Sequence, residues 1–174
     1  MVNALTLVRH LLAIAILPYV VAVQIPIWIA RRNGVVPALG SSPAAVALQA
    51  AGVGVLAVGL VLFAASLRRF VTEGRGTLAP WDPPRRLVVR GPYRFVRNPM
   101  ISGVVFVLFG EALVLRSMPH AAWAAGFFAL NLIYIPLVEE PMLEARFGES
   151  YREYRRHVPR FRPRLSPWSP DSRA

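Results

Sequence analysis

The sequence predicts an all-α integral membrane protein with four transmembrane helices and a C-terminal amphipathic helix on the cytoplasmic side. Three observations predict this class. Of the 174 residues, 55% are hydrophobic, and the mean hydropathy is +0.46. Four apolar stretches are long enough, or nearly long enough, to cross a bilayer as helices. The basic residues are concentrated in the segments between and after these stretches.

Composition also excludes several other classes. The high apolar content excludes a disordered chain, and the absence of cysteine excludes a disulfide scaffold, a thiolate metal site and a cysteine nucleophile. Twenty arginines, no lysine and nine acidic residues give a net charge of +11. A soluble nucleic-acid-binding protein with this charge is not expected to be so hydrophobic. Basic cytoplasmic loops of a membrane protein account for both properties.

The four apolar stretches are residues 11–30, 43–67, 100–115 and 121–138. The first two contain no charged residue, whereas the third is shorter and contains Glu111. Arg9 precedes the first stretch, as in a signal peptide. Its apolar run is too long for that interpretation, and no clean small-residue cleavage site follows it. We therefore expect all four stretches to span the membrane.

Arginine placement predicts the orientation of the spans. If the N-terminus, the 68–99 segment and the C-terminus are cytoplasmic, 17 arginines lie inside and three lie outside. Such an excess on one side is typical of the cytoplasmic face. The sequence therefore predicts a multi-pass protein of the cell membrane with both termini in the cytoplasm.

The two long cytoplasmic segments differ from each other. Residues 72–99 are rich in glycine, proline and arginine and predict an ordered irregular loop. From Glu139 to Pro159 the pattern predicts one amphipathic helix, and the tail from Arg164 is expected to fray. The apolar residues that share one face of this helix are Leu143, Phe147, Tyr151, Tyr154 and Val158.

Features inside the spans have structural interpretations. Residues 52–57 fit the dinucleotide pattern G-x-G-x-x-A, but close helix packing, extended by Gly59, explains them better within a membrane helix. Glu111 is a functional candidate by its position in a span. We favour a structural carboxyl bonded to a polar group such as Asn131.

The three histidines lack metal-ligand spacing, so no metal site is predicted.

The most patterned polar segment is residues 90–100, RGPYRFVRNPM, directly before the third span. Gly91 and Pro92 predict irregular backbone. At a membrane boundary, the N–H and C=O groups of such a segment must form hydrogen bonds with protein, water or a ligand. Free N–H groups near the start of a helix suit an anionic group such as a carboxylate. A plain turn is the alternative, and composition alone does not decide between the two.

Glu139 and Glu140 directly follow the last span. Adjacent helical residues face different directions, so one carboxylate can meet solvent while the other points into the protein. Arg146 is seven residues from Glu139 and lies on nearly the same helical face. The alternative is a charged cap at the membrane exit. We expect these groups to surround a cavity where the last span enters the cytoplasm.

Together these motifs resemble the isoprenylcysteine carboxyl methyltransferase family, integral-membrane enzymes related to the phospholipid N-methyltransferases. The resemblance covers about residues 72–163 and depends on the order and spacing of separate motifs. These motifs are Gly91-Pro92-Tyr93, Arg97-Asn98-Pro99-Met100 with Gly103, Glu139-Glu140 with Leu143, Phe147-Gly148, Tyr151, Tyr154 and Val158-Pro159. Residues 1–71 match only as two generic membrane helices, and residues 164–174 are left as a flexible tail.

The resemblance implies S-adenosylmethionine as the methyl donor and a lipophilic acceptor that enters sideways from the membrane lipids. Residues 72–163 are then the cofactor-binding and catalytic region. The implied cofactor-binding residues are Tyr93, Arg97, Asn98, Pro99, Gly103 and Glu139. Glu140 and Arg146 match the positions nearest the transferred methyl group and are the predicted catalytic residues.

Two positions depart from the family pattern. The usual histidine before Pro99 is Asn98, which cannot titrate near neutral pH. A frequent tyrosine after that proline is replaced by Ile101 or Ser102.

Methyl transfer from a sulfonium is an in-line displacement that needs alignment and a dry cavity. Arg146 can hold a carboxylate acceptor, whereas an amine acceptor would need Glu140 to take its proton.

The sequence leaves other functions and several acceptors open. A membrane reductase that uses a nicotinamide cofactor and an inactive membrane scaffold are the alternative functions. The acceptor can be a prenylcysteine-like carboxylate, a phospholipid amine or another amphiphile. No nucleic-acid partner is expected.

Overall fold

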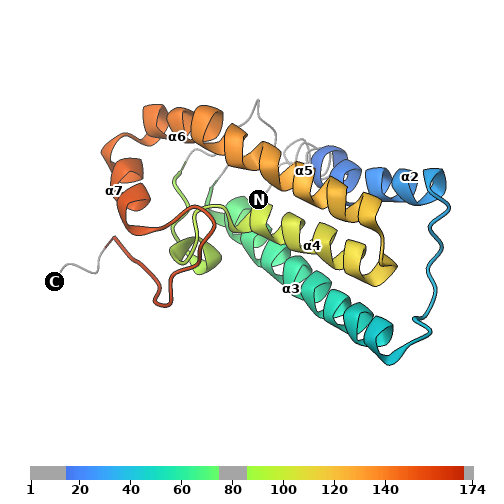
Figure 1. Cartoon of the computed structure of the whole chain (residues 1–174). Coiled ribbons are helices and arrows are strands. Elements are labelled where there is room, and N and C mark those ends of the chain that lie inside the picture. Colours follow the sequence, from blue (N-terminus) through green and yellow to red (C-terminus); the bar gives the residue numbers. More distant parts are fainter. Residues whose placement is uncertain (1–14, 75–85, 171–174) are drawn as a thin grey trace.

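The computed structural model describes residues 15–74 and 86–170, and within these ranges the chain is helical and has no strand. Its elements, in order, are η1 (Ala15–Gln24), α2 (Ile25–Arg32), α3 (Pro43–Glu73), η2 (Gly91–Arg94), α4 (Pro99–Leu115), α5 (Met118–Tyr134), η3 (Ile135–Glu139), α6 (Glu140–Phe147) and α7 (Glu149–His157). Helices α3, α4 and α5 run side by side, and η2, α7 and the C-terminal segment gather at one end of them (Figure 1).

Two helices in the described residues are long and apolar enough to cross a membrane. They are α3 and the continuous helix Met118–Phe147, which α5, η3 and α6 form together. Each is about 45 Å long, more than the roughly 30 Å of a bilayer's hydrocarbon core. Helix α4 is apolar but has 17 residues, or about 26 Å. The all-α class is therefore confirmed for the described residues, and a crossing by four helices stays a prediction.

Glycines allow α3 and α4 to pack backbone against backbone. A Cβ atom on Gly59 would lie 2.7 Å from a backbone nitrogen of α4, and one on Gly52 would lie 2.8 Å from another. From the other side, a Cβ on Gly103 would lie 2.8 Å from a backbone nitrogen of α3. These contacts confirm the packing interpretation for Gly52 and Gly59. Gly54, between them, faces open space.

The two environments of these α3 glycines give a test of the packing. We expect Gly59→Ala to destabilise the protein by about 1–3 kcal/mol, because the added methyl overlaps the α4 backbone. Gly54→Ala, in open space on the same helix, should be neutral or stabilising by up to about 1 kcal/mol because alanine favours helix. Thermal unfolding in detergent measures both. Equal melting temperatures for the two variants would contradict the close α3–α4 contact.

Glu111 does not form the expected bond to Asn131. The Asn131 side chain donates to the Phe127 carbonyl of its own helix at 2.8 Å. Among the described residues, Oε2 of Glu111 is buried and has no hydrogen-bond partner.

Gly148 divides the predicted amphipathic helix into two. Its φ of 56° and ψ of −129° form a conformation that glycine adopts readily and other residues do not. Helix α6 therefore ends at Phe147 as a continuation of α5, and α7 begins at Glu149 in another direction. The prediction of one helix from Glu139 to Pro159 was wrong, because helical spacing cannot detect a single turn residue.

The apolar face predicted for this helix still gathers into one cluster. Its members are Tyr151, Tyr154, Val158 and Trp168, with Leu143 and Phe147 packed against them. Trp168 stacks on His157 with ring centroids 5.2 Å apart. Trp168, expected as part of a flexible tail, is thus packed against α7, and residues 171–174 lie outside the described part of the chain.

Candidate functional site

The site begins in the loop that leads into α4. Gly91, with a φ of +56°, opens the 3-10 turn η2, and the Pro92 carbonyl accepts a hydrogen bond from Phe95 N at 3.0 Å. The Asn98 carbonyl then accepts from Ser102 N at 3.0 Å and begins α4. Between these two turns, the backbone of residues 94–98 is available to pair with another segment.

That segment is the C-terminal strap, which we define as residues 158–168. Arg97 N donates to the Pro159 carbonyl at 2.9 Å, and Asn98 N donates to the Arg160 carbonyl at 3.3 Å. Further along, Arg164 N donates to the Phe95 carbonyl at 2.9 Å. These backbone bonds hold the strap across the loop, so residues far apart in sequence meet at the start of α4.

Glu140 lies where the strap, the loop and α6 meet. Its two carboxylate oxygens accept hydrogen bonds from Arg160 Nε at 2.7 Å and Nη2 at 2.9 Å. Arg97 Nη1 lies 2.9 Å from the same carboxylate. Glu140 is only 5% exposed and the Arg97 side chain 9%. One buried carboxylate therefore pairs with two arginines from different segments, and the bonds to Glu140 raise the pKa of Arg160.

Tyrosines surround this ion pair. The Tyr154 hydroxyl donates to the Tyr93 carbonyl at 2.7 Å. Burial raises the pKa of Tyr93, and the negative charge of Glu139 adds to the increase. Burial, together with the charge of Glu140, raises the pKa of Tyr151 to about 12. All three phenols are therefore neutral hydrogen-bonding groups at pH 7. We call Tyr93, Arg97, Glu139, Glu140, Tyr151 and Arg160 the polar cluster.

The Arg97 side chain has buried N–H groups that form no hydrogen bond in the described residues. Its Nε and Nη1 are buried, and neither completes a hydrogen bond within the described residues, although Nη1 lies close to Glu140. A buried donor without an acceptor costs about 1–3 kcal/mol. Asn98, also buried, forms no side-chain bond to the first turn of α4. Both side chains therefore fit a role in binding a polar ligand.

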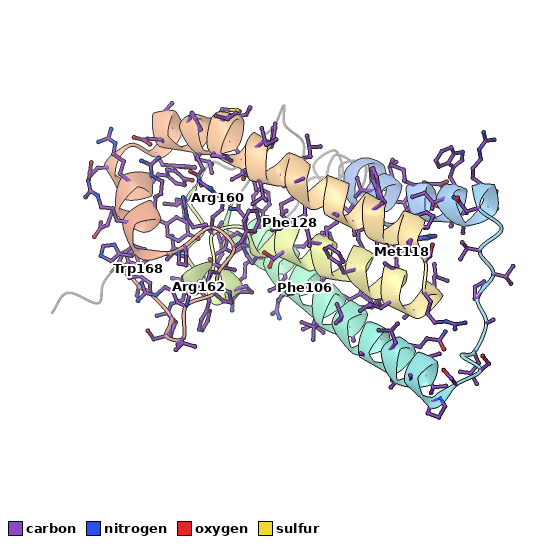
Figure 2. All side chains as sticks on the ribbon, in the orientation of Figure 1. Phe106, Met118, Phe128, Arg160, Arg162 and Trp168 are labelled. Carbon is purple, nitrogen blue, oxygen red and sulfur yellow. The ribbon has the colours of Figure 1, made fainter. Side chains whose placement is uncertain are left out.

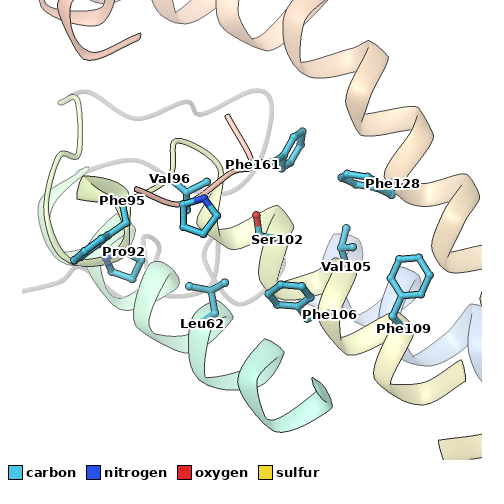
Figure 3. Close-up of a pocket in the computed structure, with 11 residues that line it drawn as sticks. Leu62, Pro92, Phe95, Val96, Ser102, Val105, Phe106, Phe109, Phe128 and Phe161 are labelled. Atoms are coloured by element: carbon cyan, nitrogen blue, oxygen red, sulfur yellow. The ribbon is translucent and has the colours of Figure 1, made fainter. Parts of the chain in front are cut away.

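An apolar pocket of about 650 Å³ lies beside the first turns of α4 (Figure 3). Its lining residues come from α3, the loop, α4, α5 and the strap: Leu62, Pro92, Phe95, Val96, Ser102, Val105, Phe106, Phe109, Phe128, Phe161 and Pro163. The volume is typical of small-molecule sites. Val96 and Phe161 line the pocket, and their neighbours Arg97 and Arg160 belong to the polar cluster. The apolar and polar parts therefore adjoin each other.

The comparisons with known proteins identify the family. Residues 48–150, more than half of the chain, match the family described as phospholipid methyltransferase. The chain belongs to this family. It is part of the same group of integral-membrane methyltransferases as the isoprenylcysteine carboxyl methyltransferases, so the resemblance seen in the sequence is confirmed. The comparisons with curated proteins and with solved structures give no match.

Most of the predicted site residues of this methyltransferase family member lie together. Tyr93, Arg97, Glu139 and Glu140 belong to the polar cluster, and Asn98 and Pro99 are the N-cap and first residue of α4 beside it. Gly103 has a different setting, because the α3 backbone fills the space where its side chain would be. Gly103 is thus a helix-packing position in this structure.

Arg146 is not brought into the polar cluster. It lies exposed on α6, and it forms no ion pair within the described ranges. Arg160, in contrast, holds Glu140 from 20 residues away in the sequence. From the sequence, Pro159 is placed at the end of a helix and in the Val158-Pro159 motif, and no role is given to Arg160. The part of the strap that carries Arg160 and Phe161 follows directly after this proline.

Proposed function

We propose that this protein is an S-adenosylmethionine-dependent methyltransferase that acts on a lipophilic acceptor at the cytoplasmic face of the membrane. Family membership supports methyl transfer. One observation carries the rest of the proposal: a buried polar cluster with an unused arginine donor, Arg97 Nε, adjoins an apolar pocket of about 650 Å³. The first part suits the charged end of a cofactor, and the second suits the apolar chain of an acceptor.

The residues of the polar cluster fit the amino-acid end of S-adenosylmethionine. Arg97 Nε would donate to its carboxylate, since it is buried and lacks a hydrogen bond in the described chain, whereas Nη1 lies against Glu140. Glu139 would hold the ammonium group, and Asn98 would add an amide donor and acceptor. When bound, the cofactor supplies an electrophilic methyl group on a sulfonium.

Of the two adjacent carboxylates, Glu139 is the one without an arginine ion pair in the described residues, so with an amine acceptor it would serve the acceptor in place of the cofactor ammonium. The carboxylate of Glu140 already binds Arg160 and faces Arg97, so it anchors the strap. An amine acceptor must lose a proton during methyl transfer, and Glu139, adjacent to the cluster tyrosines, would accept it. Tyr93 and Tyr151 keep their protons at pH 7 and would orient polar groups of the ligands.

The proposed location follows from arginine placement. A cytoplasmic N-terminus, 68–99 segment and C-terminus put 17 of the 20 arginines inside. This orientation puts the polar cluster at the cytoplasmic surface, where a soluble cofactor is available. The apolar pocket extends from there along α4, from Ser102 to Phe109, which is about 10 Å toward the bilayer interior.

Cofactor binding gives the direct test of this function. We expect the purified protein in detergent to bind S-adenosylhomocysteine in isothermal titration calorimetry, with a dissociation constant in the range of about 1 µM to 1 mM that enzymes commonly have for their substrates. The same protein should not bind NADPH. Binding of NADPH without S-adenosylhomocysteine would instead favour a membrane reductase. Binding of neither would favour an inactive scaffold.

A further inference from the structure

We propose that Phe161 determines which apolar chains the pocket accepts, and that it excludes branched or bulky chains. This inference deepens the proposed function, because it assumes that the apolar chain of a membrane lipid occupies the pocket. The pocket suits that occupant, since it lies between candidate spans and Phe106 on its wall is 41% exposed at the surface of the helical bundle.

The position of Phe161 makes it a wall of the pocket. Its ring packs edge to face against Phe128 of α5, with centroids 5.3 Å apart and an interplanar angle of 72°. Figure 3 shows these two rings on one side of the pocket, with Leu62 and Phe106 on the opposite side. The space between the two sides is therefore bounded by rings, and Phe161 is the ring that the strap contributes.

The strap holds Phe161 on both sides. Arg160, directly before it, binds Glu140 through two hydrogen bonds and accepts one from Asn98 N. Arg164, three residues after it, donates a backbone hydrogen bond to Phe95. Figure 2 shows Arg160 on the strap close to α6, with Phe128 nearby on α5. These bonds hold the backbone of Phe161 in place, so its ring can leave the pocket wall only by changing its own rotamer, which would break the edge-to-face contact with Phe128.

Phe161 also lies at the boundary between the two parts of the site. Its neighbour Arg160 belongs to the polar cluster, whereas its own ring lines the apolar pocket. A chain that fills the pocket while its head group reaches the polar cluster therefore lies against this ring. Apolar pockets distinguish ligands that differ by one methylene by about 10–200-fold. Removing a whole phenyl ring from this position should change the preference between straight and branched chains by at least about tenfold.

The test measures chain binding separately from methyl transfer. The protein is placed in nanodiscs and photolabelled with a palmitic acid that carries a diazirine in mid-chain, and the labelled residues are mapped by mass spectrometry. Unlabelled palmitic acid and the methyl-branched phytanic acid then compete for labelling. In the wild type we expect labels on pocket residues and stronger competition by palmitic acid.

Phe161→Ala is expected to reduce this preference for palmitic acid at least tenfold. Phe161→Leu, which keeps an apolar wall, should give a preference for palmitic acid between those of the wild type and the alanine variant. If the alanine variant does not fold, the leucine variant is used for the test. Trp28→Ala is the matched control, because it removes an exposed aromatic ring of α2 that does not line the pocket, and its preference should equal that of the wild type.

Two results would overturn the assignment: labels outside the pocket in the wild type, or an unchanged preference in a folded Phe161 variant. The proposed methyltransferase function fails independently of both, if S-adenosylhomocysteine does not bind.

Discussion

Replacing Glu140 with alanine is expected to lower the free energy of unfolding by about 3–5 kcal/mol. The variant leaves the buried Arg97 without its counter-charge and removes both hydrogen bonds of Arg160. Loss of one partner from a buried ion pair costs about this much, because the remaining charge stays buried. The strap would lose its side-chain attachment to α6 at the same time.

Glu144 provides a matched control for this prediction. It also accepts hydrogen bonds from two arginines, Arg152 and Arg155, but the three side chains are between 31% and 47% exposed. Exposed pairs of this kind contribute about 0.2–1 kcal/mol each. Chemical or thermal unfolding in detergent should therefore show a large loss for Glu140→Ala and a small one for Glu144→Ala. Similar losses would mean that burial does not distinguish the two carboxylates.

Local patterns in the sequence predicted the parts of the fold that depend on local chemistry. The glycines at positions 52 and 59, seven residues apart, lie on one face of a helix, and the structure places both against α4. The apolar residues from Leu143 to Val158 form one cluster, as their spacing indicated. In each case the residues that share a face lie within a few turns of one another in the sequence, and helical periodicity determines that shared face.

The contacts of the strap were not predictable in the same way. Glu140 and Arg160 are 20 residues apart, and they meet only because Gly148 reverses the chain and Pro159 ends α7. Arg146 precedes Gly148 on the continuous helix Met118–Phe147, but it lies exposed there, and Glu140 pairs with Arg160 of the strap instead. A helix drawn through Gly148 also leaves Trp168 in a tail, although Arg94 Nε donates to its carbonyl at 2.8 Å. The turn at Gly148 and the end of α7 therefore account for the contacts of the strap.

Replacing Arg97 is expected to weaken cofactor binding, whereas replacing Arg146 is not. Comparing the two variants tests whether the polar cluster is the binding site. We expect Arg97→Ala to weaken binding of S-adenosylhomocysteine by about 10–150-fold, the equivalent of about 1.5–3 kcal/mol for a hydrogen bond to a charged group. Arg97 is buried, with an unused donor, in the polar cluster. Arg146 is exposed on α6, so Arg146→Ala should change both affinity and turnover by less than about twofold.

A structural role of Arg97 must be separated from a ligand-binding role. Arg97→Lys keeps a positive charge near Glu140 but loses the planar arrangement of donors. If Arg97 holds the cofactor carboxylate, this variant should unfold at nearly the wild-type temperature and still bind S-adenosylhomocysteine at least about tenfold more weakly. If Arg97 only neutralises Glu140, the lysine variant should restore binding together with stability. A large loss of turnover in Arg146→Ala, with S-adenosylhomocysteine affinity intact, would instead place Arg146 at the acceptor, as its spacing from Glu139 first indicated.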